Sequence, residues 1–323
     1  MKTVTIPSTD LSPACIGLGS DYFGTQVPAS VAGDLLDFYT AQGGNFIDTA
    51  HIYADWIPGT QSVSEKTIGK WMADRRNRHR MILATKGGHP PLETPHISRL
   101  SRQDLYFDVE ESLRCLQTDY IDLYWLHRDD PRMPVGDMLD TLNDLVTSGK
   151  IRYFGCSNWR VTRMAEANAY AAAHQLRGFV ANQPSWSLAV LNDGSVADKT
   201  LVEMDQATIT YHHRTGLAAI PYSAQARGFF QKLPDHLKPR DRQLYWNEIN
   251  LRRAERATHL AGKYGVSISA IVLGYLTGQP FVTIPVIGTR NEVQLRDSLR
   301  AADVNLTAED IAFLADDNAN LPS

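Results

Sequence analysis

Short apolar runs alternate with amphipathic stretches along almost the whole chain. Most of the runs are continuously apolar rather than alternately apolar and polar, which is typical of parallel strands covered on both faces. They predict eight strands that begin near residues 14, 45, 81, 120, 151, 178, 217 and 281 and read ACIGLG, NFID, MILATK, YIDLYWLH, IRYFGCSN, GFVANQ, LAAIPYS and FVTIPVIG.

The stretches between these runs carry helical periodicity and helix boundary signals. Within residues 134–150 the apolar residues recur at i, i+3, i+4 and i+7, and Gly149 is placed to end that helix. Ser101 is placed to cap another helix, because an acidic residue follows it three positions later. The same cap signal recurs near the C-terminus at Thr307 and Asp310, in LTAEDIAFLADD.

Eight strands interleaved with helices predict an α/β protein that closes into a (β/α)8 TIM barrel rather than an open doubly wound sheet. No linker or change in composition divides the chain, so residues 1–323 are expected to form a single domain. The connection between the seventh and eighth strands, about 220–280, is unusually long and contains LPDHLKPRDRQLYWNE. It is expected to be either an active-site lid or a solvated insertion.

Composition and charge narrow the classes of partner. Hydrophobic residues make up 43% of the 323 residues and charged residues 21%, which suits a folded chain with a large core. The formal net charge is −4 and no basic run carries interleaved aromatic residues, which argues against nucleic acid and anionic membranes as partners. The N-terminus lacks an apolar signal region and no stretch is long enough to span a bilayer, so a soluble, cytoplasmic protein is expected.

Neither the cysteines nor the histidines are spaced as metal ligands. Cys15, Cys115 and Cys156 lie far apart, and the adjacent His212 and His213 in YHHRTG have no partner at ligand spacing. We therefore expect no metal site, and we expect Cys156 to pack as a small apolar residue inside its strand.

Polar residues stand where three consecutive predicted strands end. Asp48, Lys86 and His127 end the second, third and fourth strands, and Tyr53 lies in the loop after Asp48. The C-terminal ends of the strands of a TIM barrel form one mouth, so these four side chains are expected to meet. A lysine ammonium, oriented by an aspartate, stabilises a phenolate and lowers the tyrosine pKa from about 10. With His127 bonded to a carbonyl oxygen, the group could donate a proton while a cofactor supplies hydride.

Each of these residues also has a plain structural interpretation when taken alone. Asp48 and Lys86 could be an ordinary ion pair, His127 could be a hydrogen-bonded structural histidine, and Tyr53 could be a loop aromatic. The occurrence of all four on consecutive strands favours the catalytic interpretation.

The later strand ends suit a dinucleotide cofactor. Ser157, Asn158 and Gln183 offer hydroxyl and amide groups that could hold a carboxamide, and Tyr222 could stack on a flat heterocycle.

A second cofactor signal lies near the last strand. The residues Gly288, Thr289 and Arg290 precede a predicted helix, whose N-terminus favours anions. Arg290 could pair with a 2′-phosphate through its guanidinium, or it could simply be an exposed charge at the start of a helix.

Seven segments between about residues 14 and 300 occur in a distinctive order and spacing. They read NFIDTAHIY, ILATKGG, DYIDLYWLHR, LVTSGKIRYFGCSNW, ANQPSWSL, IPYSAQARG and IPVIGTRNEVQL. With these segments the sequence resembles the aldo-keto reductase family. The resemblance implies a TIM barrel, NAD(P)H bound without a Rossmann domain, and a catalytic tetrad of Asp48, Tyr53, Lys86 and His127.

The resemblance also implies that Ser157, Asn158 and Gln183 hold the carboxamide and that Tyr222 stacks on the nicotinamide. The cofactor site is expected to extend to Ser223, Ala224, Gln225, Gly288, Thr289, Arg290, Gln294 and Ser298.

Two features depart from the family pattern. Many members carry Glu and Asn on the last barrel helix to bind adenine, where this chain has Asp297 and Ser298, with Gln294 retained. The stretch PVIGT also lacks a lysine that many members place near the 2′-phosphate. NADPH is the expected cofactor, its preference rests largely on Arg290, and use of NADH stays open.

The substrate is expected to be a small-molecule carbonyl or alcohol. Both aromatic and charged side chains are expected around it, among them Tyr22, Trp56, Arg128 and Trp159. This mixture suits a sugar- or cyclitol-like substrate, and a broad range of aldehydes is an equally weighted alternative. The direction of the reaction and the oligomeric state stay open. A cofactor-binding regulatory subunit with little turnover is a further alternative, which the complete tetrad disfavours.

Overall fold

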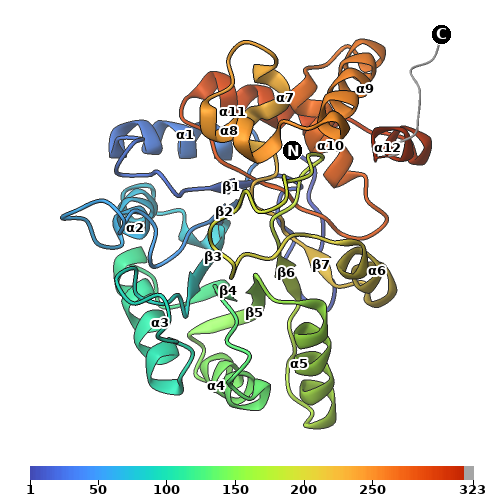
Figure 1. The fold of residues 1–323 in the computed structure, drawn as a ribbon. Coiled ribbons are helices and arrows are strands. Elements are labelled where there is room, and N and C mark those ends of the chain that lie inside the picture. Colours follow the sequence, from blue (N-terminus) through green and yellow to red (C-terminus); the bar gives the residue numbers. More distant parts are fainter. Residues whose placement is uncertain (316–323) are drawn as a thin grey trace.

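The computed structural model describes residues 1–315 and shows a barrel of eight parallel strands surrounded by helices (Figure 1). The strands follow one another around the barrel in chain order, and β8 lies beside β1. They are β1 (Gly17–Gly19), β2 (Phe46–Asp48), β3 (Ile82–Gly87), β4 (Ile121–Leu126), β5 (Ile151–Ser157), β6 (Ala181–Gln183), β7 (Ala218–Ala219) and β8 (Val286–Ile287). The predicted (β/α)8 fold is confirmed.

Helices cover the outside of the barrel between consecutive strands (Figure 1). They are α1 (Ala29–Ala41), α2 (Val63–Arg75), α3 (Arg102–Leu116), α4 (Val135–Thr147), α5 (Val161–Ala173), α6 (Gln206–Thr215), α7 (Phe229–Lys232), α8 (Pro239–Tyr245), α9 (Glu248–Tyr264), α10 (Ile268–Thr277), α11 (Glu292–Leu299) and α12 (Ala308–Ala315), with short 3-10 turns η1 (Arg78–Arg80), η2 (Ala226–Gly228) and η3 (Arg300–Asp303).

The barrel closes between β7 and the segment that leads into β8. The backbone N–H of Ala219 donates to the carbonyl of Val282 at 2.9 Å, and the N–H of Ile284 donates back to Ala219 at 2.9 Å. Both strands are much shorter than the apolar runs that predicted them. Pro221 and Pro285 lie within those runs, and a proline has no N–H to donate to a strand ladder.

Helix boundaries follow the capping signals in the sequence. The hydroxyl of Ser101 accepts from the N–H of Asp104, and Gly149 lies beyond the end of α4 with a φ of +76°. At α12, Thr307 and Asp310 bond reciprocally, because each side chain accepts from the other's backbone N–H at 3.2 Å. These boundaries are confirmed, and the last two residues of the predicted C-terminal helix lie outside the described residues.

The long connection between β7 and β8 is helical and packed. It contains α7 to α10, and the side chains of Phe229, Phe230 and Tyr245 are at most 5% exposed within the main hydrophobic core. Its buried Asp241 accepts from Arg227 at 2.6 Å. The interpretation as a solvated insertion is therefore wrong, since the segment has its own apolar anchor residues.

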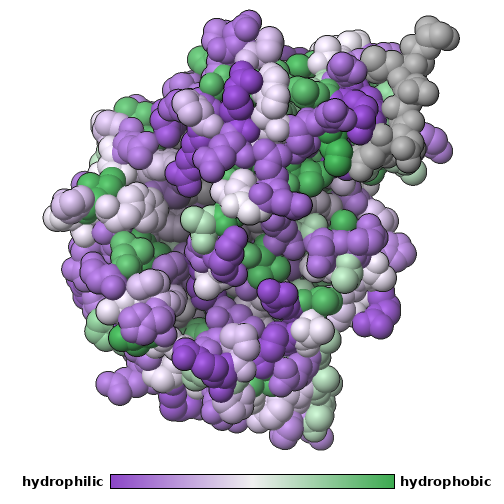
Figure 2. Space-filling view, in the orientation of Figure 1, coloured by the Kyte–Doolittle hydropathy of each residue, from purple (hydrophilic) through white to green (hydrophobic). Residues whose placement is uncertain are grey.

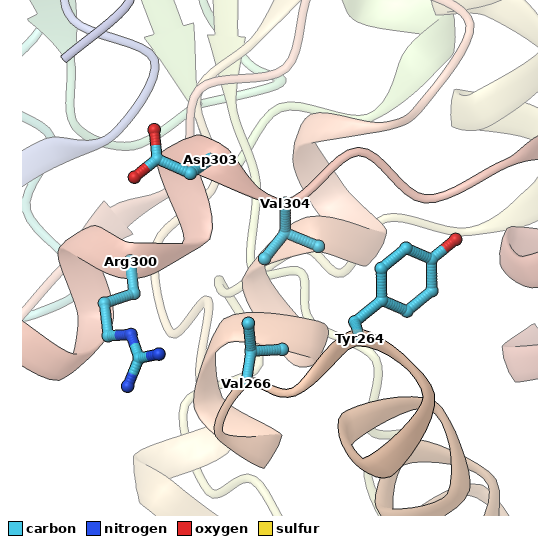
Figure 3. A pocket seen from close by; sticks show the side chains of 5 residues that line it. All are labelled: Tyr264, Val266, Arg300, Asp303 and Val304. Carbon is cyan, nitrogen blue, oxygen red and sulfur yellow. The ribbon is translucent and has the colours of Figure 1, made fainter.

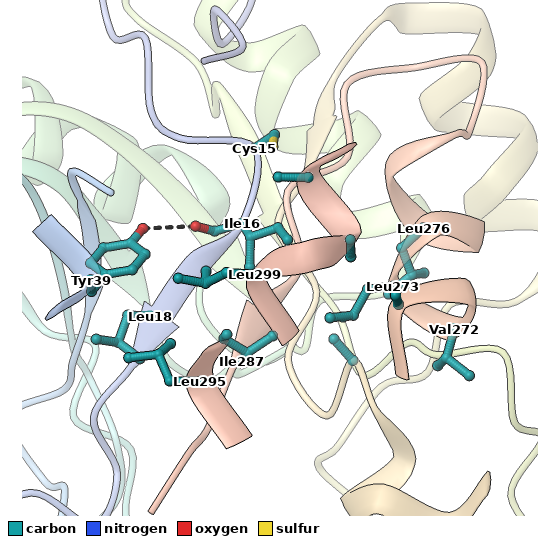
Figure 4. Packing of buried hydrophobic residues seen from close by; sticks show 14 of the residues in the cluster. Cys15, Ile16, Leu18, Tyr39, Val272, Leu273, Leu276, Ile287, Leu295 and Leu299 are labelled. Atoms are coloured by element: carbon teal, nitrogen blue, oxygen red, sulfur yellow. Dashed lines mark hydrogen bonds between the residues drawn. The ribbon is translucent and has the colours of Figure 1, made fainter. Parts of the chain in front are cut away.

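The outer core holds the helices against the strands. Figure 4 shows Leu18 and Ile287 from β1 and β8 packed among leucines from α10 and α11, with Tyr39 of α1 beside them. The hydroxyl of Tyr39 donates to the carbonyl of Ile16 at 2.7 Å, so its polar end is satisfied inside this apolar layer. Cys156, which is 0% exposed, packs in the core as predicted.

Gly69 marks a close approach between α2 and α3, and it allows a stability prediction. A Cβ at this position would lie 2.3 Å from the carbonyl oxygen of Cys115 and 2.7 Å from a backbone carbon of Leu116. We expect Gly69→Ala to lower the free energy of unfolding by about 2–3 kcal/mol, because backbone atoms cannot move aside as a flexible side chain does.

Thermal unfolding followed by circular dichroism measures this effect, and Gly262 in α9 provides the matched control. A Cβ on Gly262 meets no atom within 4 Å, so Gly262→Ala should stabilise by roughly 0.5–1 kcal/mol. Equal effects of the two substitutions would show that α2 and α3 do not approach as closely as described.

Candidate active site

The predicted strand-end residues meet at one mouth of the barrel. Asp48 is the last residue of β2, Lys86 lies near the end of β3, and His127 directly follows β4. Since neighbouring strands are parallel and in register, with Lys86 opposite Trp125, these ends lie side by side. Tyr53 comes from the loop after β2 and faces the same group.

The ammonium of Lys86 is the centre of the site. Its Nζ donates to Asp48 Oδ2 at 2.5 Å, to the Thr49 carbonyl at 2.8 Å and to Tyr53 Oη at 3.0 Å. The side chain of Lys86 is 2% exposed and that of Asp48 is 3% exposed. A buried ammonium with three acceptors is fixed in position, and one of these acceptors is the phenol.

The second carboxylate oxygen of Asp48 is held by residues that we did not predict for this role. Trp125 Nε1 donates to Asp48 Oδ1 at 3.1 Å, and Gln183 Nε2 donates to the same oxygen at 3.0 Å. Trp125 lies two positions before His127, and side chains two apart on a strand point to the same face. That spacing is the signal that could have identified Trp125.

Burial sets the protonation state of the phenol and the imidazole. Burial, followed by the charge of Asp48, raises the pKa of Tyr53 well above its usual value. The expectation of a lowered Tyr53 pKa is thus wrong for this state, because burial and the charges of Asp48 and Asp21 outweigh the opposing charge of Arg128. Burial also lowers the pKa of His127 well below its usual value, so the imidazole is neutral. The site therefore holds a protonated phenol beside a neutral histidine.

The imidazole of His127 lies between two aromatic neighbours. Its ring centroid is 6.1 Å from that of Tyr53, with an angle of 77° between the planes, and 4.8 Å from that of His89, with an angle of 67°. His127 Nδ1 is buried and has no hydrogen-bond partner among the described residues. His89 is thus a direct neighbour of the predicted tetrad.

The three residues predicted to hold a carboxamide are brought together at the ends of β5 and β6. Ser157 Oγ donates to the carbonyl of Gln183 at 2.8 Å, and Asn158 Nδ2 donates to Ser157 Oγ at 3.1 Å. Tyr222 donates its hydroxyl proton to Asn158 Oδ1 at 2.8 Å. Gln183 Oε1 is buried and unpaired among residues 1–315, so an acceptor is available for an N–H2 group.

The loop from β6 to α6, residues 184–205, crosses the centre of the barrel in Figure 1 and contacts this group. The N–H of Val202 donates to Asn158 Oδ1 at 3.2 Å. Asn158 also donates to the carbonyl of His127 at 3.2 Å, which uses the full hydrogen-bonding capacity of its amide. A carboxamide that binds to Asn158 must therefore replace one of these bonds, and the bond from Val202 is among the longest.

The remaining predicted cofactor residues form two neighbouring groups. Gln225 Nε2 donates to Ser298 Oγ at 3.0 Å, which joins the loop after β7 to α11. Arg290 is exposed and its guanidinium lies 5.0 Å from the ring centre of Tyr22, while its backbone N–H donates to Gln294 Oε1 at 3.0 Å. The other members of the two groups are Ser223 and Ala224 beside Gln225, and Gly288 and Thr289 before Arg290.

The four predicted substrate residues are not equally placed. Trp56 is 45% exposed and its ring centroid lies 6.3 Å from that of Tyr53, so its face is free beside the phenol. Tyr22 is partly exposed under Arg290. Trp159 is 1% exposed and packs edge to face on Phe179, so the expectation that it contacts substrate is not met. Trp159 lies two residues after β5, and its ring packs in the layer between strands and helices.

Asp21 is a further acidic group at the mouth, and it gives a pH-dependent stability prediction. Its Oδ1 lies 3.7 Å from where a Cβ of Gly288 would be. Burial raises the pKa of Asp21 to about 6, against the opposing charges of Lys86 and Arg290. The folded state therefore binds this proton more tightly than the unfolded state, and stability falls as pH rises from about 4 to about 6.

Asp21→Asn removes the cost of ionising this group in the folded state. At pH 8 we expect it to raise the free energy of unfolding by about 1 kcal/mol and Tm by roughly 2 °C. At pH 4 the change in Tm should be much smaller. Asp34→Asn on the exposed side of α1 is the control and should give the same small shift at both pH values. A shift for Asp21→Asn that does not depend on pH would contradict the assignment.

Two other features lie apart from the mouth. A small hollow of about 180 Å³ lies between the α9–α10 turn and η3, lined by Tyr264, Val266, Arg300, Asp303 and Val304 (Figure 3). His212 is buried in α6, where its Nδ1 lies 2.7 Å from the carbonyl of Leu217 and its Nε2 lies 3.2 Å from Asn182 Nδ2. These contacts give His212 a structural role.

The surface over the mouth is mostly hydrophilic, with hydrophobic residues scattered singly between polar ones (Figure 2). Within residues 1–315, no group of three or more His, Cys, Asp or Glu side chains is arranged to hold a metal ion. In the same residues no single helix is long and apolar enough to cross a membrane, although the bent pair α9 and α10 passes by length and composition.

Comparison with known proteins identifies relatives along almost the whole chain. The family model described as "Aldo/keto reductase family" matches residues 15–316. Norsolorinic acid reductase stcV from Emericella nidulans is 31% identical over 320 residues, which cover 95% of this chain and 78% of that protein. The putative aryl-alcohol dehydrogenase AAD14 from Saccharomyces cerevisiae is 29% identical, over 94% of this chain and 81% of that protein.

A solved structure gives the same result for the fold. A thermostable aldo-keto reductase, crystallised in complex with the inhibitor epalrestat, superimposes with a TM-score of 0.73 and 24% sequence identity, over 98% of this chain and 99% of that one. With the family match over 15–316 and the relatives above, the chain belongs to the aldo/keto reductase family of oxidoreductases, which supports interconversion of carbonyls and alcohols.

Proposed function

We propose that this protein is an NADPH-dependent reductase in which Tyr53 donates the proton to a substrate carbonyl oxygen. The observation that carries the proposal is the buried ammonium of Lys86, which contacts Asp48 and the phenol of Tyr53 at the same time. Because Tyr53 Oη accepts from Lys86, its own O–H proton is free to point into the mouth. The phenolate left after proton transfer keeps the Lys86 bond and is stabilised by it.

His127 orients the carbonyl in this proposal. Its Nδ1 is buried without an acceptor, and buried N–H groups without acceptors are rare, so we assign the proton to Nε2. An Nε2–H donor beside Tyr53 would hold the carbonyl oxygen where the phenol proton reaches it. The neutral state of His127 keeps this donor role unchanged around neutral pH.

The residues at β5, β6 and β7 fit a nicotinamide. The unpaired Oε1 of Gln183 can accept from the N–H2 of a carboxamide, and Ser157 and Asn158 lie beside it. When bound, the reduced nicotinamide supplies hydride. Tyr222 is fixed through its hydroxyl by Asn158, which leaves its ring available for stacking.

The preference for NADPH is tested at Arg290. A guanidinium bonded to a 2′-phosphate contributes about 1.5–3 kcal/mol, so Arg290→Ala should raise the KM for NADPH about 10–100-fold while the KM for NADH changes less than about 3-fold. Arg296→Ala on α11, the helix that follows Arg290, is the control, since that exposed side chain pairs with Glu292. Equal changes for both cofactors would remove Arg290 from the 2′-phosphate site.

For the substrate we propose an aryl aldehyde or ketone. The exposed ring of Trp56 beside Tyr53 offers a flat stacking surface, and relatives carry the names aryl-alcohol dehydrogenase and norsolorinic acid reductase. A sugar- or cyclitol-like carbonyl remains the competing hypothesis, because Arg128 and Asp21 supply polar contacts at the same mouth.

The test is cofactor consumption by the purified protein with a panel of aryl aldehydes, aryl ketones, keto-sugars and aliphatic aldehydes. NADPH and NADH are each used, and the reverse reaction is run with aryl alcohols and polyols. Turnover highest with aryl carbonyls supports the proposal, and turnover confined to keto-sugars or polyols supports the competing one. Tight cofactor binding without turnover in either direction would indicate a cofactor-binding regulatory subunit and overturn both.

A further inference from the structure

Arg128 is a largely buried cation at the mouth of the barrel. It directly follows His127, and its side chain is 11% exposed. Its Nη1 donates to the carbonyl of His127 at 2.9 Å, its Nε donates to Thr200 Oγ1 at 3.0 Å, and its Nη2 donates to Asp198 Oδ2 at 3.2 Å. The last two partners lie in the loop 184–205, so Arg128 is fixed between β4 and this loop.

The guanidinium retains hydrogen-bonding capacity. It carries five N–H donors, and the three bonds above leave one donor on Nη1 and one on Nη2. Asp198 neutralises it only in part, since its side chain is 44% exposed and only Oδ2 contacts the guanidinium. The other oxygen, Oδ1, accepts from the N–H and the hydroxyl of Thr200 at 2.9 and 2.6 Å.

The charge of Arg128 acts on the residues that surround the reacting carbonyl. Burial first, and then the positive charge of Arg128, lowers the pKa of His127 well below its usual value. The same two causes, in the same order, lower the pKa of His89 to about 4. Two neutral imidazoles therefore lie beside a permanent cation, and the local field favours a negative group between them.

This cation lies across the barrel from Arg290. Arg128 follows β4 in the sequence and Arg290 follows β8, and these two strands lie opposite each other in the barrel. The other buried cation of the mouth, Lys86, is already bonded to the carboxylate of Asp48. A ligand anion near His127 would therefore meet Arg128.

We propose that Arg128 selects aryl carbonyl substrates that carry an ionised oxygen substituent, a carboxylate or a phenolate, and binds that oxygen through its two remaining N–H donors. This inference rests on the proposed function and names the substrate class of the same site. The loop 184–205 takes part in this selection. Asp198 and Thr200 orient the guanidinium, and Asp198 competes with the substrate anion for it.

The experiment compares ortho-, meta- and para-carboxybenzaldehyde with their uncharged methyl esters, using the intact protein and NADPH. The readout is the ratio of kcat/KM for each acid to kcat/KM for its ester, which cancels losses common to both substrates. The wild type is expected to prefer the acid about 10-fold or more for at least one isomer, and the preference should shrink at high salt.

Three variants test the assignment through the same ratio. Arg128→Gln should bring the acid-to-ester ratio to 1 or below, and Arg128→Lys should restore part of the preference. Asp198→Asn removes the competing carboxylate and should raise the ratio above that of the wild type. If Arg128→Gln does not fold, the opposite shift in Asp198→Asn still tests the proposal.

The outcomes are distinguishable from failure of the proposed function. No turnover of either acid or ester would overturn the reductase proposal itself. Turnover of the esters with acids disfavoured in the wild type, or a ratio that Arg128→Gln and Asp198→Asn leave unchanged, would overturn the role of Arg128 alone.

Discussion

Tyr53→Phe is expected to lower kcat for aryl carbonyl reduction by about 10²–10⁴-fold while the Kd for NADPH stays within about 3-fold of wild type. The substitution removes the only atom that is proposed to donate the proton and keeps the ring. Lys86 loses one of its three acceptors but retains Asp48 and the Thr49 carbonyl, so the variant is expected to fold.

Steady-state kinetics and a cofactor binding titration together measure this effect. Tyr106→Phe on α3 is the control, because that hydroxyl accepts from the exposed Arg102. A Tyr53→Phe variant that retains kcat within about 3-fold would remove Tyr53 from the chemistry and leave proton donation to another group.

Asp48→Asn is expected to lower the free energy of unfolding by about 3–5 kcal/mol and to abolish turnover. The change is nearly isosteric, but it leaves the buried ammonium of Lys86 without its carboxylate. It also replaces the acceptor for Trp125 and Gln183 by a group that has both donor and acceptor atoms. The effect is therefore electrostatic rather than steric.

A double variant separates stability from catalysis. Asp48→Asn combined with Lys86→Met removes both charges. The double variant should therefore lose less free energy of unfolding than the two single variants lose in sum, by more than about 1 kcal/mol. Turnover should stay lost, because the phenol then lacks its ammonium. Urea unfolding and kcat/KM measure the two effects, and additive stabilities would show that the two charges do not depend on each other.

The sequence predicted the parts of the site that follow from strand ends. Asp48, Lys86 and His127 end consecutive apolar runs, and a parallel barrel must bring such ends together. The caps at Ser101 and Thr307 were also predictable, because a cap is a local interaction within three residues. The roles of the tetrad are what the Tyr53 and Asp48 variants test.

Other features depend on contacts that a linear pattern does not contain. The bond from Gln183 to Asp48 joins residues four strands apart around the barrel, and the bond from Val202 to Asn158 depends on the path of a loop without regular structure. The raised pKa of Tyr53 depends first on burial, which a linear sequence does not show.

The two clearest errors have simple physical causes. Trp159 stands among polar residues in the sequence, yet its ring turns inward onto Phe179 because the first residues after a strand can point either into the mouth or under the helices. The connection between β7 and β8 was interpreted as a lid or a solvated insertion because its first helices, α7 and α8, are short. Its buried aromatic residues show that it is part of the core.

The pairing of β1 with β8 has a consequence for biosynthesis. Gly17 and Leu18 pair with Val286 and Ile287, which lie almost at the other end of the chain. During translation the outer edge of β1 therefore stays without its neighbour until β8 has been made, and unpaired strand edges promote aggregation. Nascent chains of this protein should consequently be most prone to aggregate before β8 emerges, while this edge is unpaired.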